Sequence, residues 1–198
     1  MFTDFYFTNR SNIRSDHNIV FFQKITAQKS LTTRGFASIE KCQHDWSHKV
    51  RLPWGLSFRF VKRSGNTMPV YHLKMRYVKQ KKAFFISKEG IVSMQQSYDN
   101  GKQHIDFVQM KGNDFIAIQL YRGAFLIGEQ YFMGKYLNVQ VDSIIHVTQC
   151  SDKNESLLAD TVQNVLNIDF ICFKSVYLTR IGDKNKGSTI KIDAVEKW

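Results

Sequence analysis

Residues 56–61 read Leu-Ser-Phe-Arg-Phe-Val, and residues 71–77 read Tyr-His-Leu-Lys-Met-Arg-Tyr. In both stretches large apolar residues alternate with polar ones, which is the period of a half-buried β-strand. Arg63-Ser64-Gly65-Asn66 lies between them and is typical of a turn. A third apolar run, Ala83-Phe84-Phe85-Ile86, follows shortly after. The pattern predicts a three-stranded antiparallel meander with one apolar face, the other face carrying Arg59, His72, Lys74 and Arg76.

The segment after this meander is predicted to be helical. Ile91, Met94, Tyr98 and Ile105 recur at roughly helical spacing, so a helix over 91–108 would cover the apolar face of the sheet. Asn100-Gly101 lies inside this range and weakens the prediction, because glycine is unfavourable in a helix interior.

The rest of the chain also has mainly strand-type patterns. Residues 2–7 and 18–26 resemble strands, as do runs within 115–148, 170–179 and 189–194. Residues 152–167 are predicted to form an amphipathic helix with one apolar stripe, made by Leu157, Leu158, Val162, Val165 and Leu166. The expected fold class is therefore α+β, mainly β: an N-terminal β segment (1–49), a basic sheet-plus-helix module (50–108) and a β-rich unit (109–198).

The positive charge is concentrated in the predicted meander. The formal net charge of the chain is +11. Residues 51–88 contain ten Lys and Arg residues and no Asp or Glu, so the remaining residues together carry only +1. Such a concentration is the electrostatic footprint of a polyanion-binding surface. The alternative is a solvated face whose lysines serve solubility.

A family resemblance covers the same segment. Its motifs are Leu-Pro-Trp-Gly-Leu-Ser-Phe-Arg-Phe (52–60), Tyr-His-Leu-Lys-Met-Arg-Tyr (71–77) and Lys-Lys-Ala-Phe-Phe-Ile-Ser-Lys-Glu-Gly (81–90). On these motifs, residues 52–98 resemble the AP2 domain in the form found in phage and mobile-element proteins. The resemblance implies a three-stranded sheet in the DNA major groove with a helix packed behind it. Met94 and Tyr98 depart from the small alanines that usually face the sheet in that family.

The predicted DNA-binding residues follow from this arrangement. The resemblance directs Arg59, Lys74 and Arg76 toward bases and backbone, because Arg can pair bidentately with guanine while Lys more often holds phosphate. The whole predicted set lies between residues 51 and 82: Arg51, Trp54, Arg59, Lys62, Arg63, His72, Lys74, Arg76, Lys81 and Lys82.

Catalytic and metal-binding patterns are weak. Cys42, His44 and His48 form the only metal-like cluster, and zinc needs a fourth ligand that the local sequence does not supply. His44-Asp45 alone does not make a nuclease site, which needs further ligands and a divalent cation. No nucleotide-binding glycine motif or nucleophile elbow occurs. We expect no enzymatic activity and no cofactor.

The sequence also predicts the cellular compartment of the protein. Three widely spaced cysteines favour free thiols in a reducing compartment, and no apolar run reaches the length of a membrane helix. We therefore expect a cytoplasmic protein without a membrane partner.

These observations predict a sequence-specific double-stranded DNA-binding protein, a transcriptional regulator of phage or mobile-element origin; the origin follows from the resemblance alone. The C-terminal unit is expected to serve oligomerisation or partner contact. Two alternatives are a viral or phage structural or assembly protein with a basic interaction surface, and an RNA-binding protein that stacks bases on its aromatic residues.

Overall fold

The chain is described here by a computed structural model that covers residues 1–11, 18–27, 32–33, 35–39, 43–67, 71–73, 83–86, 92–99, 102–109, 115–150, 165–183 and 187–198. Over these residues the backbone forms β-strands and one short 3-10 turn at Phe170–Cys172, and it contains no α-helix. The strands divide between two compact units. Unit 1 combines Met1–Phe22, Arg34–Trp54 and Ile144–Trp198, and unit 2 combines Gln23–Thr33 and Gly55–Ser143.

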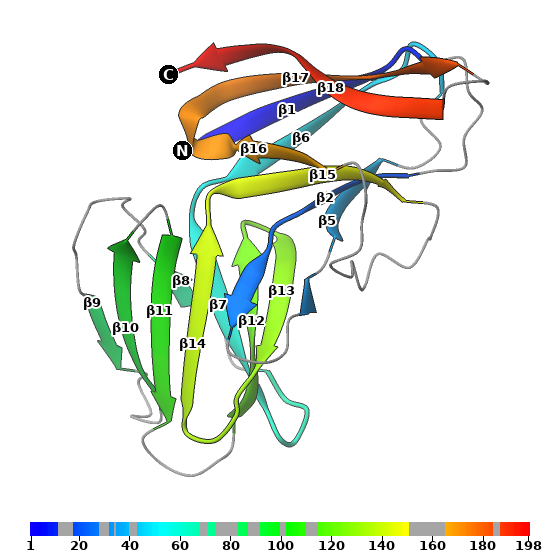
Figure 1. Cartoon of the computed structure of the whole chain (residues 1–198). Coiled ribbons are helices and arrows are strands. Elements are labelled where there is room, and N and C mark those ends of the chain that lie inside the picture. Colours follow the sequence, from blue (N-terminus) through cyan, green and yellow to red (C-terminus); the bar gives the residue numbers. More distant parts are fainter. Residues whose placement is uncertain are drawn as a thin grey trace. The chain divides into compact units, whose positions relative to one another are not determined.

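Unit 1 contains two four-stranded sheets among the described residues. Sheet A has the order β18-β17-β1-β6, and sheet B has the order β16-β15-β2-β5 (Figure 1). β1 pairs with β17 in parallel, and the other neighbours are antiparallel. The strands are β1 (Phe2–Asn9), β2 (Asn18–Phe22), β5 (Gly35–Ile39), β6 (Ser47–Pro53), β15 (Ile144–Cys150), β16 (Leu166–Asp169), β17 (Phe173–Asp183) and β18 (Gly187–Lys197).

The two sheets of unit 1 enclose a common core. Alternate residues of β1, Phe5 and Phe7, are buried, as the strand period requires. Phe5 of sheet A meets Phe21 of sheet B edge to face, with ring centroids 5.6 Å apart. Sheets A and B therefore pack face to face as a β-sandwich.

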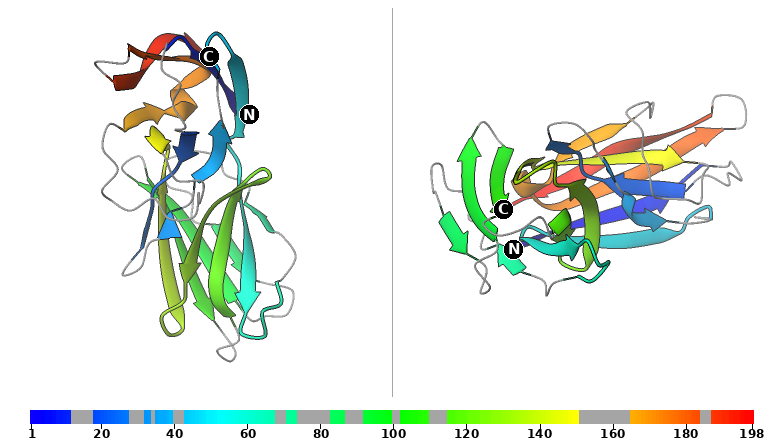
Figure 2. Two further views of the ribbon diagram at one scale, coloured as in Figure 1. Left: turned by 90° about the vertical axis from the view of Figure 1, so that its right-hand side faces the viewer. Right: turned by 90° about the horizontal axis from the view of Figure 1, so that it is seen from below.

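Unit 2 contains two five-stranded sheets among the described residues. Sheet C has the order β3-β14-β11-β10-β9, and sheet D has the order β4-β13-β12-β7-β8. Figure 2 shows these strands from two further directions. They are β3 (Ile25–Ala27), β4 (Thr32–Thr33), β7 (Leu56–Lys62), β8 (Tyr71–Leu73), β9 (Ala83–Ile86), β10 (Val92–Asp99), β11 (Lys102–Gln109), β12 (Phe115–Arg122), β13 (Phe125–Tyr131) and β14 (Tyr136–Asp142).

Phenylalanines join the two sheets of unit 2. Phe107 of β11 is fully buried and lies 5.3 Å from Phe58 and 5.8 Å from Phe60, both on β7, between ring centroids. Phe60 also contacts Phe115 of β12 at 5.1 Å. Unit 2 is therefore a second β-sandwich, and the two edge-to-face pairs that Phe107 makes between the sheets add to the stabilisation from burial.

The predicted helix over 91–108 is wrong. Residues 92–99 and 102–109 form the antiparallel pair β10–β11, in register from Val92 opposite Gln109 to Asp99 opposite Lys102. The sequence between them is Asn100-Gly101, the residue pair most typical of a two-residue hairpin connection. The weakness noted for the helix is thus a signal for a hairpin.

The predicted three-stranded meander is only partly correct. β7 and β8 pair antiparallel, with Leu56 opposite Leu73 and Phe58 opposite Tyr71, as predicted. β9, however, pairs with β10 in sheet C and is not a neighbour of β8. On its other side, β7 pairs with β12. β12 is longer than β9 and therefore offers more backbone hydrogen bonds. Among the described residues of this segment, the arrangement of three consecutive strands backed by a helix, which the AP2 resemblance implies, is therefore not formed.

The predicted helix over 152–167 falls mostly outside the described residues. Its described end belongs to β16, which pairs with β15. With the other predicted helix replaced by a hairpin, the α+β fold class is wrong, and the described chain is a pair of β-sandwiches. None of the described residues lies in a helix long and apolar enough to cross a bilayer.

Candidate nucleic-acid interface

The charge of the chain is distributed unevenly between the two units. The segments of unit 2 contain fifteen Lys and Arg residues and six Asp and Glu residues, a formal net charge of +9. Unit 1 carries the remaining +2 of the total of +11. A surface that attracts polyanions is therefore expected on unit 2.

Arg59 lies on the outer face of sheet D. Its neighbours Phe58 and Phe60 are buried, whereas Arg59 is half-buried and its guanidinium carbon is 5.6 Å from the centroid of the Tyr121 ring. This is the geometry of a cation–π contact. Among the described residues its Nε has no hydrogen-bond partner. Arg59 is thus held against an aromatic ring with one donor unused.

A polar row continues from Arg59 across the same face. Gln119 of β12 lies opposite Arg59 and donates from Nε2 to Oε2 of Glu129 on β13 at 2.8 Å. The Tyr121 hydroxyl donates to Oε1 of Gln119 at 2.9 Å. Because Glu129 places a negative charge in this row, the outer face of sheet D is mixed in charge rather than uniformly basic.

The end of β7 is more basic. Lys62 and Arg63 enter a tight turn in which Gly65 donates to the carbonyl of Lys62 at 2.9 Å, with Gly65 at a φ of +80°. Glycine adopts this conformation without steric cost, which confirms the predicted turn. Arg63 is exposed, and Lys62 Nζ lies 5.8 Å from the centroid of the Phe115 ring.

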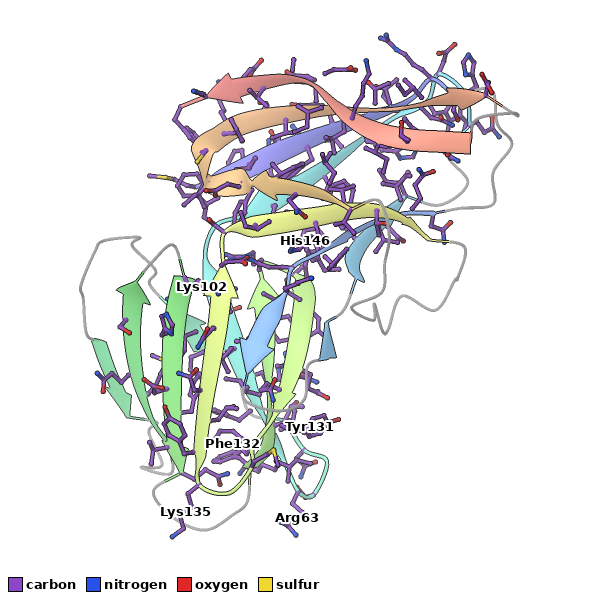
Figure 3. The ribbon with its side chains drawn as sticks, in the orientation of Figure 1. Arg63, Lys102, Tyr131, Phe132, Lys135 and His146 are labelled. Atoms are coloured by element: carbon purple, nitrogen blue, oxygen red, sulfur yellow. The ribbon has the colours of Figure 1, made fainter. Side chains whose placement is uncertain are left out.

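The connection between β13 and β14 adds a second group of residues at this end. Figure 3 shows Lys135 and Arg63 at the same end of unit 2, with Lys102 at the opposite end. Tyr131, Met133 and Tyr136 flank Lys135 with exposures of 46%, 65% and 45%. We call Lys62, Arg63 and Lys135, together with these three apolar residues, the basic end of unit 2.

The basic end combines exposed aromatic rings with cations. Exposed aromatic rings can stack on bases, and adjacent cations can hold phosphates. Tyr136 is oriented by Asp106, which accepts a hydrogen bond from its hydroxyl at 2.5 Å and thereby raises the pKa of the phenol. Sequence reasoning did not select Lys135 or the residues beside it, because Lys135 lies 72 positions after Arg63, outside the charge-rich segment 51–88, and only folding brings them to the same end.

Two of the predicted DNA-binding residues belong to unit 1. Arg51 lies on β6, where Asp4 of β1 accepts hydrogen bonds from its guanidinium. Trp54 donates from Nε1 to Oγ1 of Thr3 at 3.0 Å, and its ring meets Trp198 edge to face. Both side chains are engaged in contacts within their own unit.

The other predicted residues are described in part or not at all. His72 lies on β8, with its backbone opposite Ser57 of β7. Lys74, Arg76, Lys81 and Lys82 lie outside the described residues. The structure therefore places Arg59, Lys62, Arg63 and His72 in unit 2, with Arg59 in the middle of β7 and Lys62 and Arg63 at its end.

The metal-like cluster gains no support within the described chain. No group of three His, Cys, Asp or Glu residues that could hold a metal ion occurs among the described residues, and Cys42 lies outside them. His44 is exposed, donates from Nδ1 to the Ser11 carbonyl at 3.2 Å, and lies 3.3 Å through Nε2 from Asp45. His48 is on β6, next to Trp46.

Comparisons with protein-family models, with curated proteins and with solved structures find no match for this chain. No matched family therefore bears on the resemblance of residues 52–98 to the AP2 domain. The class of protein is defined by the fold, a β-protein of two sandwich units with most of its positive charge on one of them.

Proposed function

We propose that this protein binds nucleic acid through unit 2, with the basic end as the main contact surface and duplex DNA as the ligand. The observation that carries the proposal is the net charge of +9 on unit 2, against +2 on unit 1. Phosphate attraction supplies most of the non-specific affinity of nucleic-acid-binding proteins. The difference in net charge between the units therefore favours unit 2 as the one that contacts the nucleic acid.

Most of the binding free energy in this proposal comes from phosphate contacts. Lys62, Arg63 and Lys135 lie at turns or strand ends, where side chains reach a backbone more readily than the base edges in a groove. Base reading by Arg59, Lys74 and Arg76 was predicted from a continuous three-stranded sheet, and the pairing of β9 with β10 removes that platform. We therefore propose nucleic-acid binding that depends only weakly on base sequence. Sequence-specific regulation of transcription stays a prediction from the amino-acid sequence.

The test is the salt dependence of binding by the full chain. Fluorescence anisotropy would follow binding to duplex DNA, single-stranded DNA and duplex RNA of equal length between about 50 and 200 mM salt. We expect tightest binding to duplex DNA. Arg63→Gln and Lys135→Gln should each reduce the slope of log K against log salt by about 1, because each loses one phosphate contact.

Lys174→Gln is the matched control, since Lys174 is exposed on β17 of unit 1. It removes the same charge and should leave the slope unchanged. Equal slope changes in all three variants would show that net charge alone acts, and would overturn the basic end as the site. Preference for single strands would instead favour base stacking, and Tyr131→Ala should then cost about 1–3 kcal/mol.

A further inference from the structure

The edge strand of sheet A leaves an apolar strip uncovered. β18 has 11 residues and pairs only with β17 among the described strands. Val195 lies opposite Val176, and Ile192 lies opposite Leu178. The β17 residues of these pairs are 0% and 1% exposed, whereas Val195 and Ile192 are 39% and 40% exposed. Sheet B therefore covers the inner face of sheet A at β17, whereas on β18 Gln149 of sheet B contacts Ser188 and leaves Ile192 and Val195 exposed.

A bulge sets which residues of β18 share a face. Ala194 lies opposite Tyr177, and Ile192 lies opposite the next residue, Leu178, so Asp193 is an extra residue in β18. In an uninterrupted strand, residues 192 and 195 would point to opposite faces. The extra residue instead places Ile192 and Val195 together on the inner face, and Lys191 and Glu196 together on the outer face.

We propose that β18 pairs antiparallel with β18 of a second copy of the chain, in the register that sets Lys191 opposite Glu196 and Ile192 opposite Val195. The two-fold axis passes between Asp193 and Ala194, so each of these pairs occurs twice. The bulge makes this register possible, because both members of every pair then lie on the same face of the joined sheet.

Three features favour a second copy as the occupant. The free backbone groups of a long edge strand can continue the hydrogen-bond ladder. The register buries the two exposed apolar residues against each other across the seam. It also sets Lys191 of each copy opposite Glu196 of the other. The charge pattern of β18 is therefore complementary to a second β18 strand that runs in the opposite direction.

The existing contacts of these charged residues are compatible with the pairing. Lys191 Nζ lies 3.0 Å from Oδ1 of Asp193, and the Tyr177 hydroxyl donates to Oε1 of Glu196 at 3.0 Å. The Lys191 side chain is 52% exposed. Because these contacts lie on the solvent side of the sheet, each group can take a second partner across the new strand pair.

The test is sedimentation velocity of the full chain over about 1–100 µM, the range in which weak to moderate complexes dissociate. We expect the native chain to form dimers. Lys191→Glu or Glu196→Lys should weaken the dimer about tenfold, because each creates two like-charge pairs. The double variant K191E/E196K should restore dimerisation, since the opposite charges then face each other again.

Ile192→Thr should also weaken the dimer, because it removes the apolar seam while keeping a β-branched residue. Ile181→Thr is its control: Ile181 is 38% exposed on β17 and lies outside the seam. A monomeric native chain, or a charge-swapped variant that stays monomeric while folded, would overturn the proposal. Nucleic-acid binding by unit 2 is measured separately and does not depend on this result.

Discussion

The guanidinium of Arg51 donates two hydrogen bonds to the carboxylate of Asp4, from Nε to Oδ1 at 2.8 Å and from Nη2 to Oδ2 at 3.1 Å. Lys49 Nζ lies 2.8 Å from Oδ2 of the same carboxylate. Asp4 is 7% exposed, so two cations from β6 surround a largely buried anion on β1. The most N-terminal residue of the charge-rich segment thus stabilises the pairing of two strands in unit 1.

This carboxylate should make stability depend on pH. The hydrogen bond from Arg51, with a further contribution from Lys49, lowers the pKa of Asp4 below its ordinary value. The ionised carboxylate therefore stabilises the fold fully above about pH 4, the pKa in the unfolded chain, and loses this contribution as pH falls through the lower folded pKa. Urea denaturation from neutral to acidic pH, followed by tryptophan fluorescence, measures the effect.

Asp4→Asn should be less stable than the native chain near neutral pH, and the difference should shrink as the pH falls below about 4. Parallel stability curves for the two proteins across this range would show that Asp4 does not titrate with folding.

Arg59 and Arg51 should respond differently to the same substitution. Arg59→Gln removes a single cation–π contact, with Tyr121 on the outer face of sheet D, and should lower the free energy of unfolding by less than about 1 kcal/mol. It should also reduce the salt slope of DNA binding. Arg51→Gln should destabilise the chain and leave the salt slope unchanged, because Arg51 is occupied by Asp4 in unit 1. Chemical denaturation and anisotropy titrations of both variants measure these two effects. A salt slope that falls only for Arg51→Gln would show that Arg51, and not Arg59, contacts DNA.

Phe107 should be among the most sensitive core positions of unit 2. It is fully buried between sheets C and D and touches two rings of β7. Phe107→Ala should cost about 3–5 kcal/mol, because it leaves a cavity as well as losing burial. Phe107→Leu should cost clearly less, since it retains most of the volume. Equal losses in chemical denaturation would contradict a packed ring cluster.

Gly182 is required by the close approach of β17 and β18. Its φ is +149°, and a Cβ at this position would lie 2.1 Å from the carbonyl oxygen of Gly187. Gly182→Ala should destabilise the chain by roughly 1–3 kcal/mol through this backbone conflict. Gly55→Ala is the control, because a Cβ there meets nothing within 4 Å. Thermal melts of the two variants should therefore diverge; similar melting temperatures would remove the steric argument.

Local patterns could predict single strands and turns. The alternation in residues 56–61 correctly separated buried Phe58 and Phe60 from Arg59, and Gly65 correctly indicated a turn. The hairpin β10–β11 was misread because Met94 and Tyr98 are four residues apart. That spacing brings residues together on one face of a helix and also on one face of a strand. Asn100-Gly101 was the signal that could have decided between them.

The amino-acid sequence by itself determined which residues of a strand face the core and where most of the positive charge lies. Only the tertiary structure decided that β9 joins β10 rather than β8, and that Lys135 lies at the same end of unit 2 as Arg63. The physical reason is that strand alternation specifies a face and not a partner. Any strand with an apolar face can complete a sheet, so the choice depends on packing among segments far apart in the chain.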